Sequence, residues 1–459
     1  MPLVPIPVHS YALNARSASS ARLVNVYAEA APAGEKSPII LRTAPGIRAY
    51  ATLAGGGRGL YACKLGLFAV AGNTLYRVAN GAGIALGAIP SLERVAMADN
   101  GLELVITTDQ QLRVWTGTEV VQVTDVGLDG RLPGVCAFLD QYILFVDENS
   151  GRFFSSDLSD AQEYDALDFA TAEASPDDLV TLAVDHRNAV LFGTTTTELW
   201  YNSGATGYPF ERVPGGIIEL GALAKYGVGK IDNTVFWLAS DRTARRLNGS
   251  TPVRVSSHGV EEKWRDYARV DDCQVFTFTS MGHLFVCFRF PSAGAAWLYD
   301  ITTNEWHERE SYLGLPWRVC ASVEWNGVTY VQDAETGSVG ILDGEAFTEW
   351  GNTLRGEWTY SGVWNGGNRV FHHEMEIGCE TGVGLSSGQG DDPMLTLQAS
   401  DDGGRTWRTL PVKSIGRQGE YRKRVRWHRL GSASHRVYRM AFSDPVPLTV
   451  WDTQLRASA

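Results

Sequence analysis

The eight residues from 400 to 407 carry the most specific motif in the chain. Ser400, Asp402, Gly404, Thr406 and Trp407 occupy every fixed position of the Asp-box pattern S-x-D-x-G-x-T-W. In such a box the carboxylate accepts backbone N–H bonds, the glycine permits a turn, and the tryptophan packs beneath it. The motif therefore predicts a structural turn.

Paired carboxylates are the groups from which a glycosidase would be built. Acidic doublets occur at 177–178, 271–272 and 401–402, but neighbouring residues on a strand point to opposite faces. Sialidases also carry Asp boxes, usually several and away from the catalytic site, whereas this sequence has one. We predict no catalytic residues and no enzymatic activity. The alternative is a carbohydrate-binding or sialidase-like glycoside-hydrolysing propeller acting in receptor recognition.

Two further clusters have residue types that hold a metal ion or a phosphate. On an extended strand His372, Glu374 and Glu376 would share one face, but the helical HExxH spacing of zinc enzymes is absent. The run Gly-Val-Gly-Lys at 227–230 is similar to a phosphate loop, but Ile231 stands where Ser or Thr would ligate magnesium. The sequence predicts neither a metal site nor a cofactor.

Positive charge is concentrated toward the C-terminus. Residues 405–439 contain eleven Lys or Arg and one acid, a local charge of +10; because the chain totals −12, the remainder carries −22. Alternation over 421–427 predicts aromatic and apolar side chains on the inner face of a strand and arginines on the outer face. These candidate interface residues are Arg422, Arg424 and Arg426. Their partner is either an acidic protein surface, such as a neighbouring subunit, or DNA.

The elements that position these residues are β-strands. In the stretch 318–342, Asn326–Gly327 separates two runs rich in β-branched and aromatic residues, which predicts a hairpin, and a third apolar run follows a polar break. The same arrangement recurs upstream, and its third-strand residues lie roughly 40 to 50 positions apart, the period of a four-stranded propeller blade. These residues are Tyr76, Trp115, Phe154, Trp200, Leu247, Leu298 and Leu342.

The fold class that follows is all-β, with a β-propeller of about six or seven blades over residues 51–348. A pair of β-sandwiches would also give short strands at regular spacing, but it has no reason to repeat one three-strand arrangement. A single amphipathic helix is predicted within 258–272, where apolar residues recur on one side.

The two ends of the chain differ from the repeats. Residues 1–50, with prolines at 2, 5 and 7, predict an extended, mostly unpaired N-terminal arm with one short strand near 23–27. This arm packs either on its own domains or on a neighbouring subunit. Longer alternating strands over 349–459 predict a separate β-sandwich that contains the Asp box.

The cysteines and the N-terminus bear on where the protein is made. The six cysteines are spread singly, without a CxxC pair, and several stand inside apolar strands. We expect buried thiols formed in a reducing cytosol. The first residues lack a basic region followed by an apolar core, and no apolar run approaches a membrane span, so we expect neither export nor a membrane anchor.

The arm sequence RSASSARLVNVYAE, followed by LRTAPGI before the first blade, resembles the start of a known family. The family is that of the packaged-DNA stabilisation proteins, also called tail hub or nozzle proteins, of short-tailed bacteriophages. The order of arm, propeller and C-terminal β-rich region is similar over most of the chain. The resemblance implies a structural virion protein located in the phage tail and made in the host cytoplasm.

The resemblance also implies an assembly and its partners. Six copies would form a ring below the portal and its adaptor, the head-to-tail connector protein, retaining packaged DNA and extending the channel for DNA ejection. Tail fibres, tailspikes or a tail needle are further partners. DNA would pass through the ring without sequence-specific binding, and an acidic chain suits this role because it does not hold phosphates.

Overall fold

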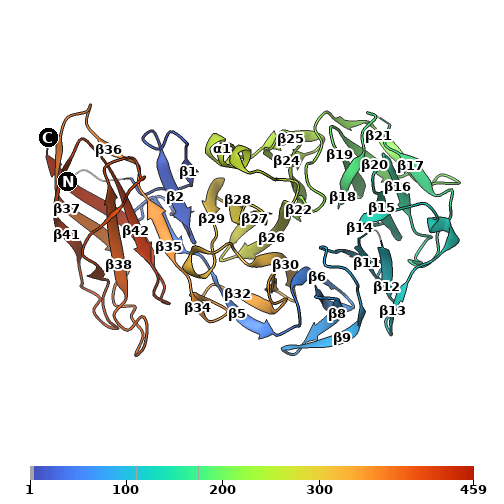
Figure 1. Cartoon of the computed structure of the whole chain (residues 1–459), viewed down its shortest axis with the longest axis horizontal. Helices are drawn as coiled ribbons and strands as arrows, with labels where there is room; N and C mark the ends of the chain where they lie inside the picture. The colour runs from blue at the N-terminus through green and yellow to red at the C-terminus, as the bar shows by residue number, and fades with distance from the viewer. Residues whose placement is uncertain (1–4, 110, 174, 459) are drawn as a thin grey trace.

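The strands form a ring of sheets and, beside it, a sandwich (Figure 1). The computed structural model describes residues 5–109, 111–173 and 175–458. Six four-stranded antiparallel blades follow one another along the chain: β6 to β9 (57–88), β10 to β13 (96–122), β14 to β17 (133–171), β18 to β21 (179–218), β22 to β25 (228–254) and β26 to β29 (274–308).

The seventh blade is assembled from two distant parts of the chain. Three of its strands are β30 (Val319–Trp325), β31 (Val328–Asp333) and β32 (Val339–Asp343). The fourth is β5 (Gly46–Ala51), which pairs antiparallel with β32. The N-terminal strand therefore closes the ring, and the predicted β-propeller is confirmed, with seven blades.

Local sequence explains the repeated hairpins. Asn326 (φ 51°) and Gly327 (φ 74°) form the predicted two-residue turn, and both adopt the positive φ that this turn requires. The seven residues predicted to mark third strands all lie on the third strand of a blade. Four other blades join their first two strands by turns with two positive φ angles: Asp140–Gln141, His186–Arg187, Asp232–Asn233 and Met281–Gly282.

The predicted helix is present as α1 (His258–Asp266), between the fifth and sixth blades. The Ser257 side chain caps it by accepting the N–H of Val260. Trp264 is fully buried and packs against aromatic residues of the sixth blade, which anchors the helix there. Among the described residues, no helix has the length and apolar character needed to cross a membrane.

The sandwich has two sheets that enclose one apolar core. One sheet has the order β3 (Val26–Ala30), β4 (Ile39–Thr43), β43 (Thr449–Ser458), β37 (Val370–Cys379) and β41 (Val425–Ala433). The other contains β2 (Ser20–Val24), β35 (Gly356–Thr359), β42 (His435–Phe442), β38 (Met394–Ser400) and β39 (Arg408–Thr409). Trp358 and Trp427 are buried between them. The C-terminal β-sandwich is confirmed.

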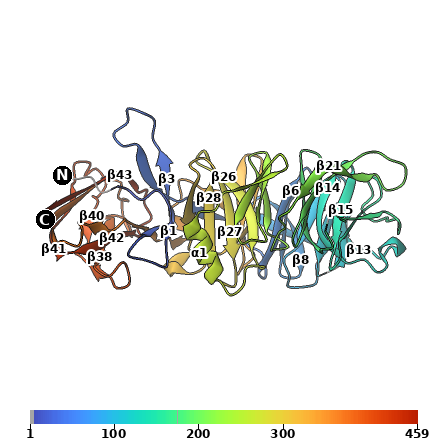
Figure 2. The ribbon, with the colours of Figure 1, turned by 90° about the horizontal axis from the view of Figure 1, so that it is seen from above.

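The prediction of a mostly unpaired arm is wrong for the described residues of that segment; residues 1–4 lie outside them. β2 pairs with β35 of the sandwich and, at Val24, with the outermost strand of the sixth blade, β29 (Glu305–Glu308). A continuous sheet therefore runs from the propeller into the sandwich. The hairpin of β3 and β4 projects beyond both (Figure 2). The division into 1–50, 51–348 and 349–459 stays a proposal.

Candidate functional site

The Asp-box residues form a closed turn after β38. Ser400 Oγ donates to Asp402 Oδ1 (2.6 Å), and the Asp402 carboxylate accepts the backbone N–H groups of Arg405 (2.8 Å) and Thr406 (2.9 Å). These hydrogen bonds, from the Ser400 and Thr406 hydroxyls first, hold the pKa of Asp402 well below its usual range. Gly404 (φ 87°) adopts the left-handed conformation that the turn needs.

Trp407 does not lie wholly beneath this turn. Its ring is half-buried, and the guanidinium carbon of Arg439 stacks 4.1 Å from the ring centroid. The outer part of the ring forms a wall of a cleft where the arm, the propeller and the sandwich meet. The box thus places an aromatic side chain in a cleft as well as closing a turn.

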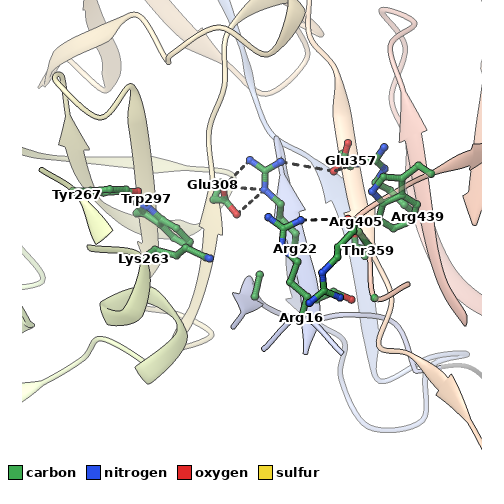
Figure 3. A pocket seen from close by; sticks show the side chains of 15 residues that line it. Arg16, Arg22, Lys263, Tyr267, Trp297, Glu308, Glu357, Thr359, Arg405 and Arg439 are labelled. Carbon is green, nitrogen blue, oxygen red and sulfur yellow. Dashed lines mark hydrogen bonds and ion pairs between the residues drawn. The ribbon is translucent and has the colours of Figure 1, made fainter. Parts of the chain in front are cut away.

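This junction cleft has a volume of about 490 Å³. Figure 3 shows Lys263, Tyr267 and Trp297 on the propeller side, Arg405 and Arg439 on the sandwich side, and Arg16 and Arg22 of the arm between them. Five cationic side chains line it, against two carboxylates, Glu308 and Glu357. The site is therefore a cationic cleft with aromatic walls. No local pattern predicts it, because its residues come from distant segments of the chain.

Arg22, on β2, holds the base of the junction cleft together. It donates three hydrogen bonds to Glu308 of the sixth blade (2.8, 3.0 and 3.0 Å) and one to Glu310 (2.6 Å), and it lies 3.8 Å from Glu357 of the sandwich. Burial opposes its charge, but the surrounding glutamates raise its pKa above the ordinary arginine value. This charge is therefore neutralised within the chain.

Three cations at the rim of the junction cleft, unlike Arg22, donate their side-chain hydrogen bonds to neutral oxygen atoms. Arg16 donates to the Gly404 carbonyl (3.4 Å), Lys263 to the Asn14 side-chain oxygen (3.0 Å), and Arg405 to the Asp402 carbonyl (2.8 Å). None of the ion pairs among the described residues involves them. The rim therefore presents positive charge that nearby carboxylates do not neutralise.

The predicted arginine face lies on the opposite sheet of the sandwich. Arg424 donates two hydrogen bonds to Glu376 of β37 (2.7 and 2.8 Å), and Arg426 lies 3.0 Å from the same carboxylate. Arg422 is exposed in the turn before β41, and no ion pair among the described residues includes it. The charges of two of the three arginines are therefore neutralised by a glutamate on the neighbouring strand.

The alternation predicted for this sheet is broken at two points. A bulge between His372 and Glu374 reverses the phase of β37, so His372 is buried, with Nδ1 3.0 Å from the Tyr438 hydroxyl, while Glu374 and Glu376 face outward. The predicted common face of these three residues is wrong. Likewise, β41 begins only at Val425, so Tyr421 is exposed rather than part of the inner face.

The axis of the propeller is bridged by side chains at one end. Arg94, before the second blade, donates to the Cys320 carbonyl of the seventh (2.6 Å), and the Tyr226 hydroxyl, before the fifth, donates to the Arg94 carbonyl (2.6 Å). Lys225 forms an ion pair with Glu148 of the third blade. Since these blades are not neighbours in the ring, the contacts must lie across its axis, and burial lowers the pKa of Arg94 there.

Comparison with known families accounts for almost the whole chain. The family described as Bacteriophage P22 Gp10, beta-propeller, matches residues 14–346, and the one described as Bacteriophage P22 Gp10, beta-sandwich, matches residues 358–458. The chain belongs to the P22 Gp10 family. It is a structural tail protein of a bacteriophage, of the tail hub and stabilisation type, and the resemblance found in its sequence is confirmed.

Solved structures show more distant similarity, and no curated protein matches. The designed protein Ika8 is 14% identical, with 64% of this chain and 99% of that chain covered and a TM-score of 0.39. BamB from Moraxella catarrhalis is 12% identical (61% and 92% covered, TM-score 0.38). The Swd1 β-propeller domain from Myceliophteria thermophila is 11% identical (64% and 98% covered, TM-score 0.42).

Proposed function

We propose that copies of this chain form the hub, or nozzle, ring of a short-tailed phage, below the portal and adaptor, where the ring retains packaged DNA and extends its exit channel. The observation that carries the proposal is the match of both the propeller and the sandwich to one phage tail family. The net charge of −12 supports it, because a protein of net negative charge does not attract the DNA phosphates and so does not hold DNA in its channel.

The bridged propeller axis indicates where such a channel would run. A path through one propeller would have to open the contacts of Arg94 with Cys320 and Tyr226, and the ion pair of Lys225 with Glu148. A path between copies requires no such rearrangement. In our proposal DNA therefore passes through the centre of a ring of six copies, and each propeller belongs to the wall.

Phage particles assembled without the chain test this role. We expect heads that lose their DNA, measured as nuclease-accessible genome, and images in which the ring below the adaptor is missing. Supplying the wild-type chain should restore both. Particles that lack the protein and yet keep their genome to the wild-type extent would contradict the proposal, as would particle images that place the protein elsewhere than below the adaptor.

We further propose that the protein has no glycosidase activity. Asp401, of the only doublet near the Asp box, accepts two hydrogen bonds from the buried Arg436 (2.6 and 2.7 Å), which lower its pKa, and Asp402 is held by the turn itself. Neither carboxyl group is suited to donate a proton at neutral pH. Hydrolysis of sialosides that survives purification and is lost in Asp401→Asn would overturn this.

The arginine face remains a proposed contact with another subunit or partner protein. In this assembly it would act mainly through Arg422, because Arg424 and Arg426 already pair with Glu376. The adaptor, the fibres or tailspikes and the tail needle are the partners proposed for the remaining surfaces. Reversing the charge of this face and of the junction cleft in separate variants distinguishes the two surfaces.

A further inference from the structure

A loop on the far side of the propeller has the opposite character to the junction cleft. Between the third and fourth strands of the third blade, residues 156–168 contain no Lys or Arg, and the stretch free of cations extends from 153 to 185. Four of its acidic residues are exposed and take part in none of the ion pairs among the described residues. These are Asp157, Asp160, Glu163 and Asp165.

The acidic loop also exposes apolar side chains. Leu158 and Leu167 are 56% and 78% exposed, and Phe169, which follows the loop, is 38% exposed. Exposed apolar side chains that gather in one place, with polar residues around them, are typical of a contact surface. Here three of them come from one loop and the strand that follows it. Burial, then the neighbouring Asp165 and Asp157, raises the pKa of Asp168, although the nearby Arg131 partly offsets this. Arg131 donates to backbone carbonyls of the loop, so its hydrogen bonds leave the exposed carboxylates of the loop free.

The acidic loop cannot reach the junction cleft of its own chain. The loop belongs to the third blade, whereas Lys263 and Tyr267 of the cleft belong to the segment just before the sixth blade, on the other side of a seven-bladed ring. Figure 1 shows β16 (Arg152–Ser155) and β17 (Phe169–Thr171) at one end of the molecule, and α1, β1 (Tyr11–Ala12) and β2 toward the sandwich. A contact between them must join two copies.

We propose that the acidic loop of one copy binds in the junction cleft of the next. Asp160, Glu163 and Asp165 would meet the rim cations Arg16, Lys263 and Arg405, and Leu158 or Leu167 would pack against the cleft aromatics, Trp407 among them. The contact joins two different surfaces of the same chain, so repeating it produces a closed ring where the rotation closes. This inference rests on the proposed ring and names the surfaces that form it.

A charge-swap experiment on the full-length chain tests this contact. The cleft variant combines Arg16→Glu, Lys263→Glu and Arg405→Glu, and the loop variant combines Asp160→Lys, Glu163→Lys and Asp165→Lys. We expect either variant alone to raise the concentration needed for ring formation by roughly tenfold or more, since several ion pairs become repulsive together. Sedimentation and particle images measure this, with the chain alone and on tails that carry the portal and adaptor.

Mixing the two variants gives the decisive measurement. In an alternating ring each reversed cleft meets a reversed loop, and each wild-type cleft meets a wild-type loop, so we expect rings to return to near the wild-type level. A matched control reverses three exposed cations outside the cleft, Lys64→Glu, Arg77→Glu and Arg369→Glu, and should form rings as the wild type does. Melting curves of all variants establish that each is folded.

The outcomes separate this inference from the proposed ring itself. If the wild-type chain forms no ring, either alone or on the tail, the proposed function is overturned. If wild-type rings form and the cleft variant also forms them normally, the loop-to-cleft contact is wrong although the ring stands. If both variants fail and their mixture also fails, the two surfaces do not meet. If the cleft variant forms rings but loses the adaptor, the cleft belongs to that partner.

Discussion

Two cationic regions of this protein, the arginine face and the rim of the junction cleft, differ in whether carboxylates neutralise their charges. On the arginine face, Arg424 and Arg426 share Glu376, on the neighbouring strand of the same sheet. At the rim of the junction cleft, the charged side chains of Arg16, Lys263 and Arg405 donate to neutral oxygen atoms. The arginine face accounts for three of the eleven cations of residues 405–439, and two of these three are paired within their own sheet. The three rim cations take part in none of the ion pairs among the described residues.

A run of basic residues therefore does not by itself locate a partner surface. Residues 405–439 carry +10, but strand pairing brings Glu374 and Glu376 alongside the arginines of β41. The rim cations come from the arm, from α1 and from the Asp-box turn, and none of the ion pairs among the described residues includes them. Exposed ion pairs are individually weak, so an unmatched cluster is the better candidate for binding an acidic partner.

The largest expected effect is on the free energy of unfolding, when the tryptophan behind the arginine face or the one in the wall of the junction cleft is replaced by alanine. Trp427 lies on the inner face of β41 and is 1% exposed, so Trp427→Ala should destabilise the protein by about 3 to 5 kcal/mol. Trp407 is half-buried in the cleft wall, so Trp407→Ala should cost roughly half as much. Urea denaturation measures both. If Trp407→Ala left stability unchanged and abolished ring formation, the Asp box would be a recognition site alone.

Arg22→Ala should give the next largest effect, because it leaves Glu308 and the buried Glu357 without this cation. Breaking a buried ion pair costs about 3 to 5 kcal/mol, and since the Arg22 side chain is 35% exposed we expect roughly 2 kcal/mol. Arg16→Ala, at the rim, should change stability by less than about 0.5 kcal/mol. If Arg22→Ala and Arg16→Ala lost the same stability, the distinction between the ion-paired Arg22 at the base of the cleft and the rim cation Arg16 would be wrong.

A smaller effect is expected from reversing the arginine face. In Arg422→Glu, Arg424→Glu, Arg426→Glu, new carboxylates oppose Glu374 and Glu376, which should destabilise the monomer by about 1 kcal/mol and weaken rings, more so at low salt. The matched Gln triple variant removes the charge without repulsion. Rings that persist in the Gln variant would remove this face from the interface, and loss of DNA retention with intact rings would assign it to nucleic acid.

The smallest effect concerns the Asp box at low pH. The pKa of Asp402 is lowered in the fold by the hydrogen bonds from Ser400 and Thr406, so its contribution to stability is fully present above the ordinary aspartate pKa and is lost as the pH falls through its lowered value. Asp402→Asn should therefore be less stable than the wild type at pH 7, and the gap should narrow in strong acid. Thermal melts over that range measure it, and a gap independent of pH would contradict the assignment.

Features decided by short-range chemistry could be predicted from the sequence. The seven third-strand residues and the Asn326–Gly327 turn follow from alternation and from backbone φ preferences, which act over a few residues. The Asp-box turn likewise closes within its own residues. The turns at Asp140–Gln141 and His186–Arg187 have the same geometry without the glycine that marks it, so their sequences alone would not identify them.

The tertiary structure decided what depends on distant segments. Pairing of β5 with β32 closes the propeller, and pairing of β2 with β29 and β35 joins it to the sandwich. These partners could not be predicted from the sequence, because a strand pairs through the backbone groups at its edge and the local side-chain pattern does not specify which distant strand it meets. The bulge after His372 turned Glu374 and Glu376 outward against the arginines. Local sequence is therefore enough to predict the blades and the Asp-box turn. The neutralised cations and the unpaired cations of the junction cleft can be told apart only in the folded chain, because their partners come from distant segments.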